Sequence, residues 1–322
     1  MVLTILILTL LGLTGAAAAA FYIRGLEPQD VWSIGVYEGA EPLDLCPSPL
    51  ALGQPVLTAS DVTDATARFV ADPFIVRDGN QWWMFIEVLN KRSRRGEIAV
   101  ASSRDGLAWT YDRVVLRETF HLSYPYVFEA EGGYCMIPES GQSGVVRLYR
   151  AVAFPYEWQF DRVLLPGRYV DASVLHFEGR WWLFAQRDGR ALDLFFADHV
   201  DGPWVGHPAN PIVLDDAAAS RPGGRILQWD GRIIRYAQDG VFTYGRRVRA
   251  FHVEELTTTR YRERECAQSP VLDATGSGWN ANGMHHVDAM QLATGRWIAA
   301  VDGKRIVQRF NWRRAVRPLF AR

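Results

Sequence analysis

The chain has 322 residues, 48% of them hydrophobic and 12 of them Trp, which is enough apolar material for a large core in one or two domains. Its 35 Lys and Arg nearly balance its 36 Asp and Glu, giving a formal net charge of −1. This balance argues against the bulk electrostatic attraction on which non-specific binding to nucleic acid depends. We therefore expect no nucleic-acid partner.

Residues 2–23 are almost wholly apolar, a run long enough to cross a bilayer as a helix. The small residues at 16–20 also fit the cleavage region of a secretory signal. No basic segment precedes the run, which counts against both readings, and a buried helix is a third alternative. We expect a signal peptide or membrane anchor over residues 1–24, contact with the membrane through it, and an exported or membrane-anchored, extracytoplasmic protein.

The next feature along the chain is its cysteines, which are three in number and widely spaced. An odd number at such spacing predicts neither a zinc motif nor a disulfide framework. Cys135 lies within an expected hairpin and fits a small apolar core residue. A disulfide between Cys46 and Cys266, which stand in similar local contexts, is left as an open alternative.

Five related segments recur at intervals near 50 residues, and they begin at residues 71, 123, 170, 220 and 284. Each has an apolar stretch, a Gly-containing turn and a second apolar stretch, which is typical of a β-hairpin. A second repeated phrase between the hairpins supplies two more strands per unit. Four-stranded units repeated about an axis predict an all-β fold, a five-bladed β-propeller over residues 25–322, preceded by an N-terminal hydrophobic helix.

The fifth unit has little chain left after Val301 for its outer strands. Residues 30–39 form a good strand candidate near the other end of the chain. We expect this segment to complete the last blade, because closing the ring protects open sheet edges.

A hairpin brings the start of its first strand and the end of its second strand to the same rim, so each blade contributes one pair of residues to a common mouth. The pairs are Asp72 with Glu87, Tyr124 with Glu139, Asp171 with Gln186, Arg221 with Gln238, and His286 with Asp302. Asp239 and His285 adjoin this set. A polar ring at the narrow end of a concave scaffold is typical of a small-ligand site.

Clustered carboxylates fit glycosidic-bond chemistry, in which a protonated carboxyl acts as acid and an ionised one as base or nucleophile. Crowding of like charges raises the pKa of one carboxyl, whereas Arg221 holds another in the charged form. Each residue also has a structural interpretation: Asp72-Pro73 is an ordinary entry to a strand. Adjacent strand residues face opposite ways, so only one of His285 and His286 reaches the axis.

The phrases ADPFIV…WWMF, DASVLHFEGRWWLF and IAVASSRDGLAW resemble the five-bladed glycoside hydrolases of the arabinanase and β-xylosidase type. The resemblance implies that Asp72 is a general base and that Asp171 stands, as Asp for Glu, where the acid lies. Tyr124 occupies the middle position, which is a carboxylate in those enzymes. Relatives of this architecture sometimes hold Ca²⁺ near an axial His, and an axial Ca²⁺ is left as an open alternative here. No oxygen-ligand loop is visible in the sequence, so we expect no cofactor.

A closer similarity is to the N-terminal propeller domain of the plant glucosamine inositolphosphorylceramide transferases and its bacterial relatives. It rests on HLSYPYVFE, RGEIAVASSRDG and SRPGGRI…RYAQDG and spans residues 32–303. The resemblance implies that, in the plant family, a separate C-terminal glycosyltransferase domain carries out the transfer, and we expect this chain to lack that domain.

Three functions are left open, and whether the chain is an enzyme is open with them. The first is a glycoside hydrolase-like propeller that acts on a glycan or glycoconjugate, with Asp72 as base or nucleophile and Asp171 or Glu139 as acid. The second is a non-catalytic carbohydrate-binding module that assists a separate glycosyltransferase, and the third is a protein-interaction propeller. The expected substrate-binding residues are Glu87, Tyr124, Gln186, Arg221, Gln238, Asp239, His286 and Asp302.

Overall fold

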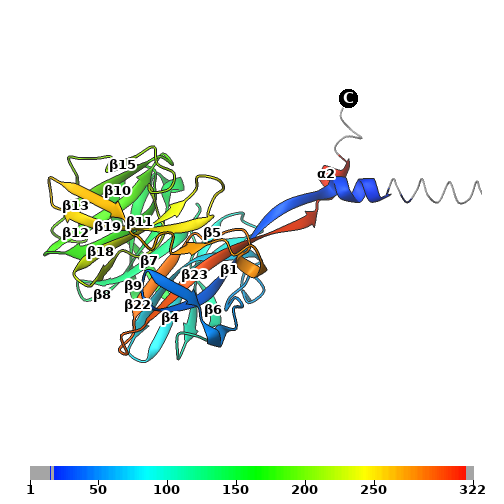
Figure 1. The fold of residues 1–322 in the computed structure, drawn as a ribbon, viewed down its shortest axis with the longest axis horizontal. Helices are drawn as coiled ribbons and strands as arrows, with labels where there is room; N and C mark the ends of the chain where they lie inside the picture. The colour runs from blue at the N-terminus through cyan, green and yellow to red at the C-terminus, as the bar shows by residue number, and fades with distance from the viewer. Residues whose placement is uncertain (1–14, 16–17, 317–322) are drawn as a thin grey trace, which may run out of the picture. The chain divides into compact units, whose positions relative to one another are not determined.

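A computed structural model describes residue 15 and residues 18–316 of the chain. These residues divide into two compact units, one of Trp32–Arg305 and the other of the described residues up to 31 together with 306–316. The larger unit is a five-bladed β-propeller, as the repeats predict (Figure 1). Each blade is an antiparallel sheet built around four strand positions.

The first two blades each follow one repeat of the sequence. Blade 1 contains β3 (Ala67–Asp78), β4 (Gln81–Asn90), β5 (Gly96–Ser103) and β6 (Thr110–Leu116). Blade 2 contains β7 (Ser123–Ala130), β8 (Gly133–Glu139), β9 (Val145–Ala153) and β10 (Glu157–Pro166). Residues 82–88 of β4 are buried almost without a break, because neighbouring blades cover both faces of the sheet.

The next two blades have interrupted strands. Blade 3 contains β11 (Tyr169–Phe177), β12 (Arg180–Arg187), β13 (Ala191–Ala197) and an outer strand in two pieces, β14 (Val205–Gly206) and β15 (Val213–Leu214). Blade 4 contains β16 (Arg221–Pro222), β17 (Leu227–Trp229), β18 (Arg232–Asp239), β19 (Arg247–Leu256), β20 (Tyr261–Glu265) and β21 (Leu272–Asp273). Gly223 and Gly224 interrupt its inner strand, where a Cβ on Gly224 would lie 1.8 Å from the Val287 carbonyl oxygen.

The last blade joins the two ends of the propeller. Its strands run in the order β22 (Val287–Gln291), β23 (Trp297–Phe310), β1 (Leu26–Glu41) and β2 (Asp44–Pro47). β1 and β23 lie side by side (Figure 1). The prediction that residues 30–39 complete the fifth blade is therefore confirmed.

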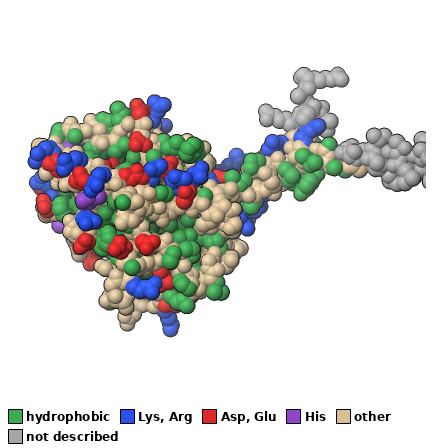
Figure 2. Space-filling view, viewed as in Figure 1, with side chains coloured by type: hydrophobic (Ala, Val, Ile, Leu, Met, Phe, Trp, Pro, Cys, Tyr) green, Lys and Arg blue, Asp and Glu red, His purple; other side chains and the backbone are tan. Residues whose placement is uncertain are grey.

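Three short 3₁₀ helices lie in the described connections of the propeller, at Pro49–Ala51, Gly141–Ser143 and Gly278–Asn280. Cys135 is buried as expected, and the three cysteines are all free, so the alternative of a Cys46–Cys266 bridge is wrong. Figure 2 shows positive and negative side chains interspersed over the visible face, in keeping with the balanced charge of the sequence.

The smaller unit contains a helical segment at residues 18–25 and the helix α2 (Trp312–Val316). The sequence analysis predicted a helix near the N-terminus but did not predict α2. The Asn311 N–H donates to the Gly25 carbonyl oxygen at 2.7 Å, and Tyr22 stacks on Phe310 at 5.5 Å. Within the described residues, no helix has the length and apolar character needed to cross a membrane. Most of the expected signal or anchor lies outside the described residues.

Inner strands of different blades are bonded to one another around the axis. Tyr126 on β7 donates its hydroxyl to the Val174 carbonyl oxygen on β11 at 2.6 Å. Arg225 binds the buried Asp288 through Nε at 2.7 Å, and Asp288 also accepts the Ile75 N–H at 2.6 Å. These bonds between sheets position the inner strands, and with them the ends that carry the candidate site.

Candidate functional site

Three inner strands share one distortion at the rim. Asp72, Tyr124 and Asp171 have φ of 52°, 45° and 53°, the left-handed region that residues other than Gly seldom adopt. The ladder of each hairpin shifts register at these residues, so each blade has a bulge at the same place. Strained backbone of this kind costs about 1–3 kcal/mol per residue and is concentrated at functional sites.

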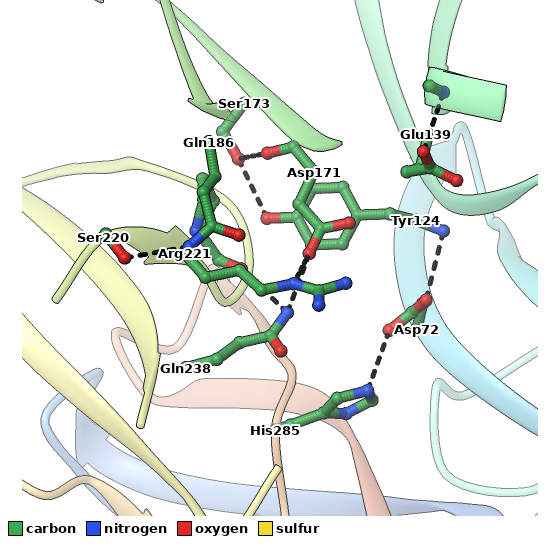
Figure 3. Close-up of polar contacts among 12 residues, drawn as sticks. Asp72, Tyr124, Glu139, Asp171, Ser173, Gln186, Ser220, Arg221, Gln238 and His285 are labelled. Carbon is green, nitrogen blue, oxygen red and sulfur yellow. Dashed lines mark hydrogen bonds and ion pairs between the residues drawn. The ribbon is translucent and has the colours of Figure 1, made fainter. Parts of the chain in front are cut away.

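One side of the mouth is a buried ion pair. Arg221 donates Nε–H to Asp171 Oδ2 at 2.5 Å, and Gln238 donates its side-chain amide to the same oxygen at 2.9 Å (Figure 3). Gln238 also donates to the Pro222 carbonyl oxygen, while its own Oε1 is buried without a partner among the described residues. Gln186 donates to Ser220 Oγ at 2.8 Å. Asp171 is thus an anchor that orients Arg221 and Gln238.

The opposite side of the mouth is a chain of Asp302, His285 and Asp72. His285 Nδ1 lies 2.7 Å from Asp302 Oδ2, and its Nε2 lies 3.6 Å from Asp72 Oδ1. Asp72 Oδ2 accepts the Tyr124 N–H at 3.2 Å. Burial lowers the pKa of His285, but Asp302 and Asp72 outweigh it, so this pKa lies above its usual value. Burial raises the pKa of Asp72 to about 7, although His285 opposes the rise.

Two glutamates complete the acidic part of the mouth. Burial, together with the charge of Asp171, raises the pKa of Glu139 to about 7, and the Gly141 N–H bound to Glu139 Oε1 at 2.7 Å opposes this. Burial and the charge of Asp72 hold the pKa of Glu87 well above its usual range. Glu87 Oε1 lies 3.5 Å from Nε2 of His121. The site therefore contains buried carboxyls whose pKa values lie above the usual range.

Three expected mouth residues face elsewhere. The Tyr124 hydroxyl donates to the Gly224 carbonyl oxygen at 3.0 Å and accepts the Gly224 N–H at 2.8 Å. It therefore connects the inner strands of blades 2 and 4. His286 packs edge-on against Phe74 and Tyr124, and the strand alternation turns His285 to the mouth in its place. Asp239 accepts the Arg249 Nε–H at 2.8 Å, so its carboxylate binds a side chain of the neighbouring strand β19.

Two aromatic residues of the mouth, Trp32 and Tyr244, were not predicted from the sequence. The Arg221 guanidinium lies over the Tyr244 ring at 5.2 Å, and Trp32 stacks on His285 at 4.0 Å. Tyr244 lies in the connection between β18 and β19, which reaches the rim because β18 ends there. The sequence could have indicated Tyr244 as a mouth residue, because the loop that follows each inner hairpin must lie at the mouth.

A hollow of about 180 Å³ opens beside the ion pair. Its lining comes from blades 3 and 4 and from the β18–β19 connection. The lining residues are Gln186, Gly189, Ala217, Arg221, Gln238, Gly240, Tyr244 and Gly245. The hollow thus offers amide and guanidinium groups and one aromatic ring, and a few placed polar groups beside an aromatic ring are common in small-molecule sites.

The residues around the axial histidine do not fit calcium, which takes six to eight oxygen ligands. His286 contacts the rings of Phe74 and Tyr124. Ligand atoms of Asp72, His285 and Asp302 lie within 4.8 Å of one another, but they provide only two carboxylates and one imidazole. His285 and Asp302 are moreover bonded to each other.

Comparison with known protein families gives a match over most of the chain. A family model described as "Glucosamine inositolphosphorylceramide transferase 1, N-terminal" matches residues 26–304. The chain is 36% identical over 308 residues to glucosamine inositolphosphorylceramide transferase 1 of Oryza sativa subsp. japonica, covering 88% of this chain and 41% of that protein. For the Arabidopsis thaliana protein, identity is 34% over 300 residues, covering 85% and 39%. The chain spans about two fifths of the length of these curated relatives.

Solved structures share the fold at low sequence identity. A β-1,2-mannobiose phosphorylase of Listeria innocua superposes with a TM-score of 0.58 at 11% identity, covering 84% of this chain and 96% of that one. An exo-1,5-α-L-arabinanase from a bovine ruminal metagenomic library gives 0.53 at 18% identity, covering 77% and 94%. Identities this low show a common fold alone.

Proposed function

Because the chain belongs to the family of N-terminal domains of glucosamine inositolphosphorylceramide transferase 1, we propose that its mouth binds and acts on the sugar of a glycan or glycoconjugate. The observation that carries this proposal is the set of buried carboxyls at the mouth. Asp72 and Glu139 both have a pKa raised to about 7, where a carboxyl can donate and accept protons at neutral pH.

The roles follow from the contacts of each carboxyl. Asp72 is the base, because His285 Nε2 and the Tyr124 N–H hold its two oxygens in place. Glu139 is the acid, since burial keeps it protonated near neutral pH and one of its oxygens is oriented by Gly141. Asp171 is better suited to positioning Arg221 than to acting as the acid, because Arg221 and Gln238 both bind its Oδ2.

A second candidate is a carbohydrate-binding module that assists a separate glycosyltransferase. The observation in its favour is Tyr124, which stands where the resembling hydrolases have a carboxylate and whose hydroxyl is fully engaged by blades 3 and 4. Binding of sugar without turnover distinguishes this candidate from the enzyme.

The experiment is a glycan array followed by an assay of aryl glycosides with wild type, Asp72→Asn and Glu139→Gln. We expect the wild type to bind, and both variants to lose at least a hundredfold in any turnover that the wild type shows, the contribution of a positioned acid or base. Asp198→Asn is the control, because that side chain is largely exposed. Full turnover in both variants removes their catalytic roles, and binding with no turnover supports the module.

We also propose that residues 1–24 export or anchor the protein outside the cytoplasm, on the strength of the apolar run at residues 2–23. Fractionation of cells that express the full chain, compared with a chain starting at residue 25, tests this. Equal amounts of both in the cytoplasm contradict it.

A further inference from the structure

Asp302 is a fully buried carboxylate that collects hydrogen bonds from two blades. Its Oδ1 accepts the N–H groups of His285 and His286 at 3.1 Å each, and its Oδ2 accepts the Asp72 N–H at 3.1 Å. Backbone N–H groups that point at a carboxyl favour its ionised form. Burial raises the pKa of Asp302, but the contacts with His285 outweigh it, so this pKa lies below its usual range. Asp302 is therefore a fixed negative charge.

This fixed charge determines which nitrogen of His285 carries a proton. Nδ1 lies 2.8 Å from Asp302 Oδ1 and 2.7 Å from Oδ2. An ionised carboxylate only accepts hydrogen bonds, so Nδ1 is the donor. The ring stacks on Trp32 at 4.0 Å and meets the Tyr244 ring edge-on at 5.2 Å, and these two contacts hold its plane. The nitrogen left to exchange a proton is Nε2, which faces Asp72.

His285 Nε2 lies 3.6 Å from Asp72 Oδ1, and the two side chains point toward each other in Figure 3. This distance is just longer than a hydrogen bond, and contacts between catalytic groups commonly tighten when a substrate binds. A neutral ring accepts a proton from Asp72 here, and a charged ring donates one, so a single proton serves both groups. The other charged groups around the pair are Arg221, Asp171, Glu87 and Lys304.

We propose that His285 is a positioning residue that shares one proton with Asp72, and that Asp302 fixes its ring for this task. The inference rests on the proposed function and deepens it, because it names the group that controls the base.

The shared proton gives a balanced reaction with water as the second reactant. Water gives a proton to Asp72, and its oxygen bonds to the anomeric carbon. The bond to the leaving group breaks with its electron pair on the leaving oxygen, which takes the proton of Glu139. The proton on Asp72 passes to His285 Nε2, where Asp302 balances the charge of the imidazolium. It is then lost to solvent, and Glu139 regains a proton before the next turnover.

The first arm of the test needs no sugar. NMR of the imidazole nitrogens between pH 5 and pH 9 follows the titration of His285, whose signals are assigned by their loss in His285→Gln. In Asp72→Asn the midpoint is expected to move to lower pH, because burial lowers the pKa of His285 and one of the two carboxylates that outweigh burial is gone. Asp198→Asn is the control, since its side chain is 76% exposed, and it leaves the midpoint unmoved. Equal midpoints in wild type and Asp72→Asn overturn the inference.

The second arm measures kcat/KM against pH for a glycoside that the wild type turns over. Burial raises the pKa of Asp72 and His285 opposes the rise, so the acid limb of His285→Gln is expected to move to higher pH. A move of about one pH unit lowers kcat/KM about tenfold at pH 6 and changes it little at pH 9. Loss by the same factor at every pH indicates a merely structural role and overturns the inference.

The outcomes separate this inference from the proposed function. If the wild type turns over no glycoside, the proposed enzyme is wrong and the role of His285 falls with it. Turnover with an unmoved midpoint, or with an unmoved acid limb, removes the inference and leaves the proposed function standing. If His285→Gln does not fold, the ring is assigned through its contact with Trp32, and the titration in Asp72→Asn decides the question.

Discussion

Replacement of Glu139 with Gln offers the sharpest test of the electrostatics of the mouth, because it removes a buried acid and keeps its shape. Gln retains the oxygen that accepts the Gly141 N–H. We expect Glu139→Gln to be more stable than wild type at pH 8 and nearly equal to it at acidic pH.

The magnitude follows from the pKa of Glu139, which burial raises from 4.5 to about 7. Between these values the folded protein holds a proton that the unfolded chain has released, so the stability of wild type falls as the pH rises. Each pKa unit corresponds to about 1.4 kcal/mol, so the full loss is roughly 3 kcal/mol above pH 7. Gln has no such proton. The stability of Glu139→Gln relative to wild type therefore grows by roughly 2–3 kcal/mol between pH 5 and pH 8.

Urea denaturation at pH 5, 6, 7 and 8 measures this difference directly. Glu129→Gln is the control, since Glu129 is exposed on β7 in the same blade, and it is expected to shift the midpoint little at any pH. A difference between Glu139→Gln and wild type that is constant across pH, or that shrinks as the pH rises, refutes the reasoning. Gain of stability with loss of turnover in one variant is the usual sign of a residue kept for function.

Three further changes test other parts of the site. Arg221→Met leaves the buried Asp171 without its ion-pair partner and is expected to lower the free energy of unfolding by about 3–5 kcal/mol in urea, so a loss below about 1 kcal/mol contradicts the pairing. Tyr244→Ala removes the apolar area of a ring at the hollow and is expected to weaken sugar binding about tenfold by calorimetry, and equal affinity excludes the ring from the site. Gly224→Ala places a Cβ 1.8 Å from a backbone oxygen at φ 143° and is expected to lower thermal stability by about 3 kcal/mol or more. In contrast, Gly133→Ala, with open space around it, should cost under about 1 kcal/mol, and equal effects contradict the close contact.

The sequence determined the architecture, because the repeated hairpins carry their own turn and strand signals. It also placed Asp72, Glu87, Glu139, Asp171, Arg221 and Gln238 at one rim, since a hairpin returns its second strand to the level where the first began. The closing of the ring by β1 followed from the strands that the last unit lacked. These inferences need only the local strand and turn patterns and the repetition of one unit around an axis.

Only the tertiary structure decided which atoms meet at that rim. At Asp72, Tyr124 and Asp171 the bulges shift the strand register, so the side-chain direction there does not follow the regular alternation of a β-strand. His285 rather than His286 reaches Asp72, and Tyr244 arrives from a connection outside the repeat. Side-chain direction at a bulge, and the fold of a loop at the mouth, depend on other blades. These lie 49 to 230 residues away in the sequence, as the Tyr124 bond to Ser173 and the Asp72 bond to Asp302 show. No local pattern encodes contacts between blades, and these contacts set the burial and the pKa values of the site.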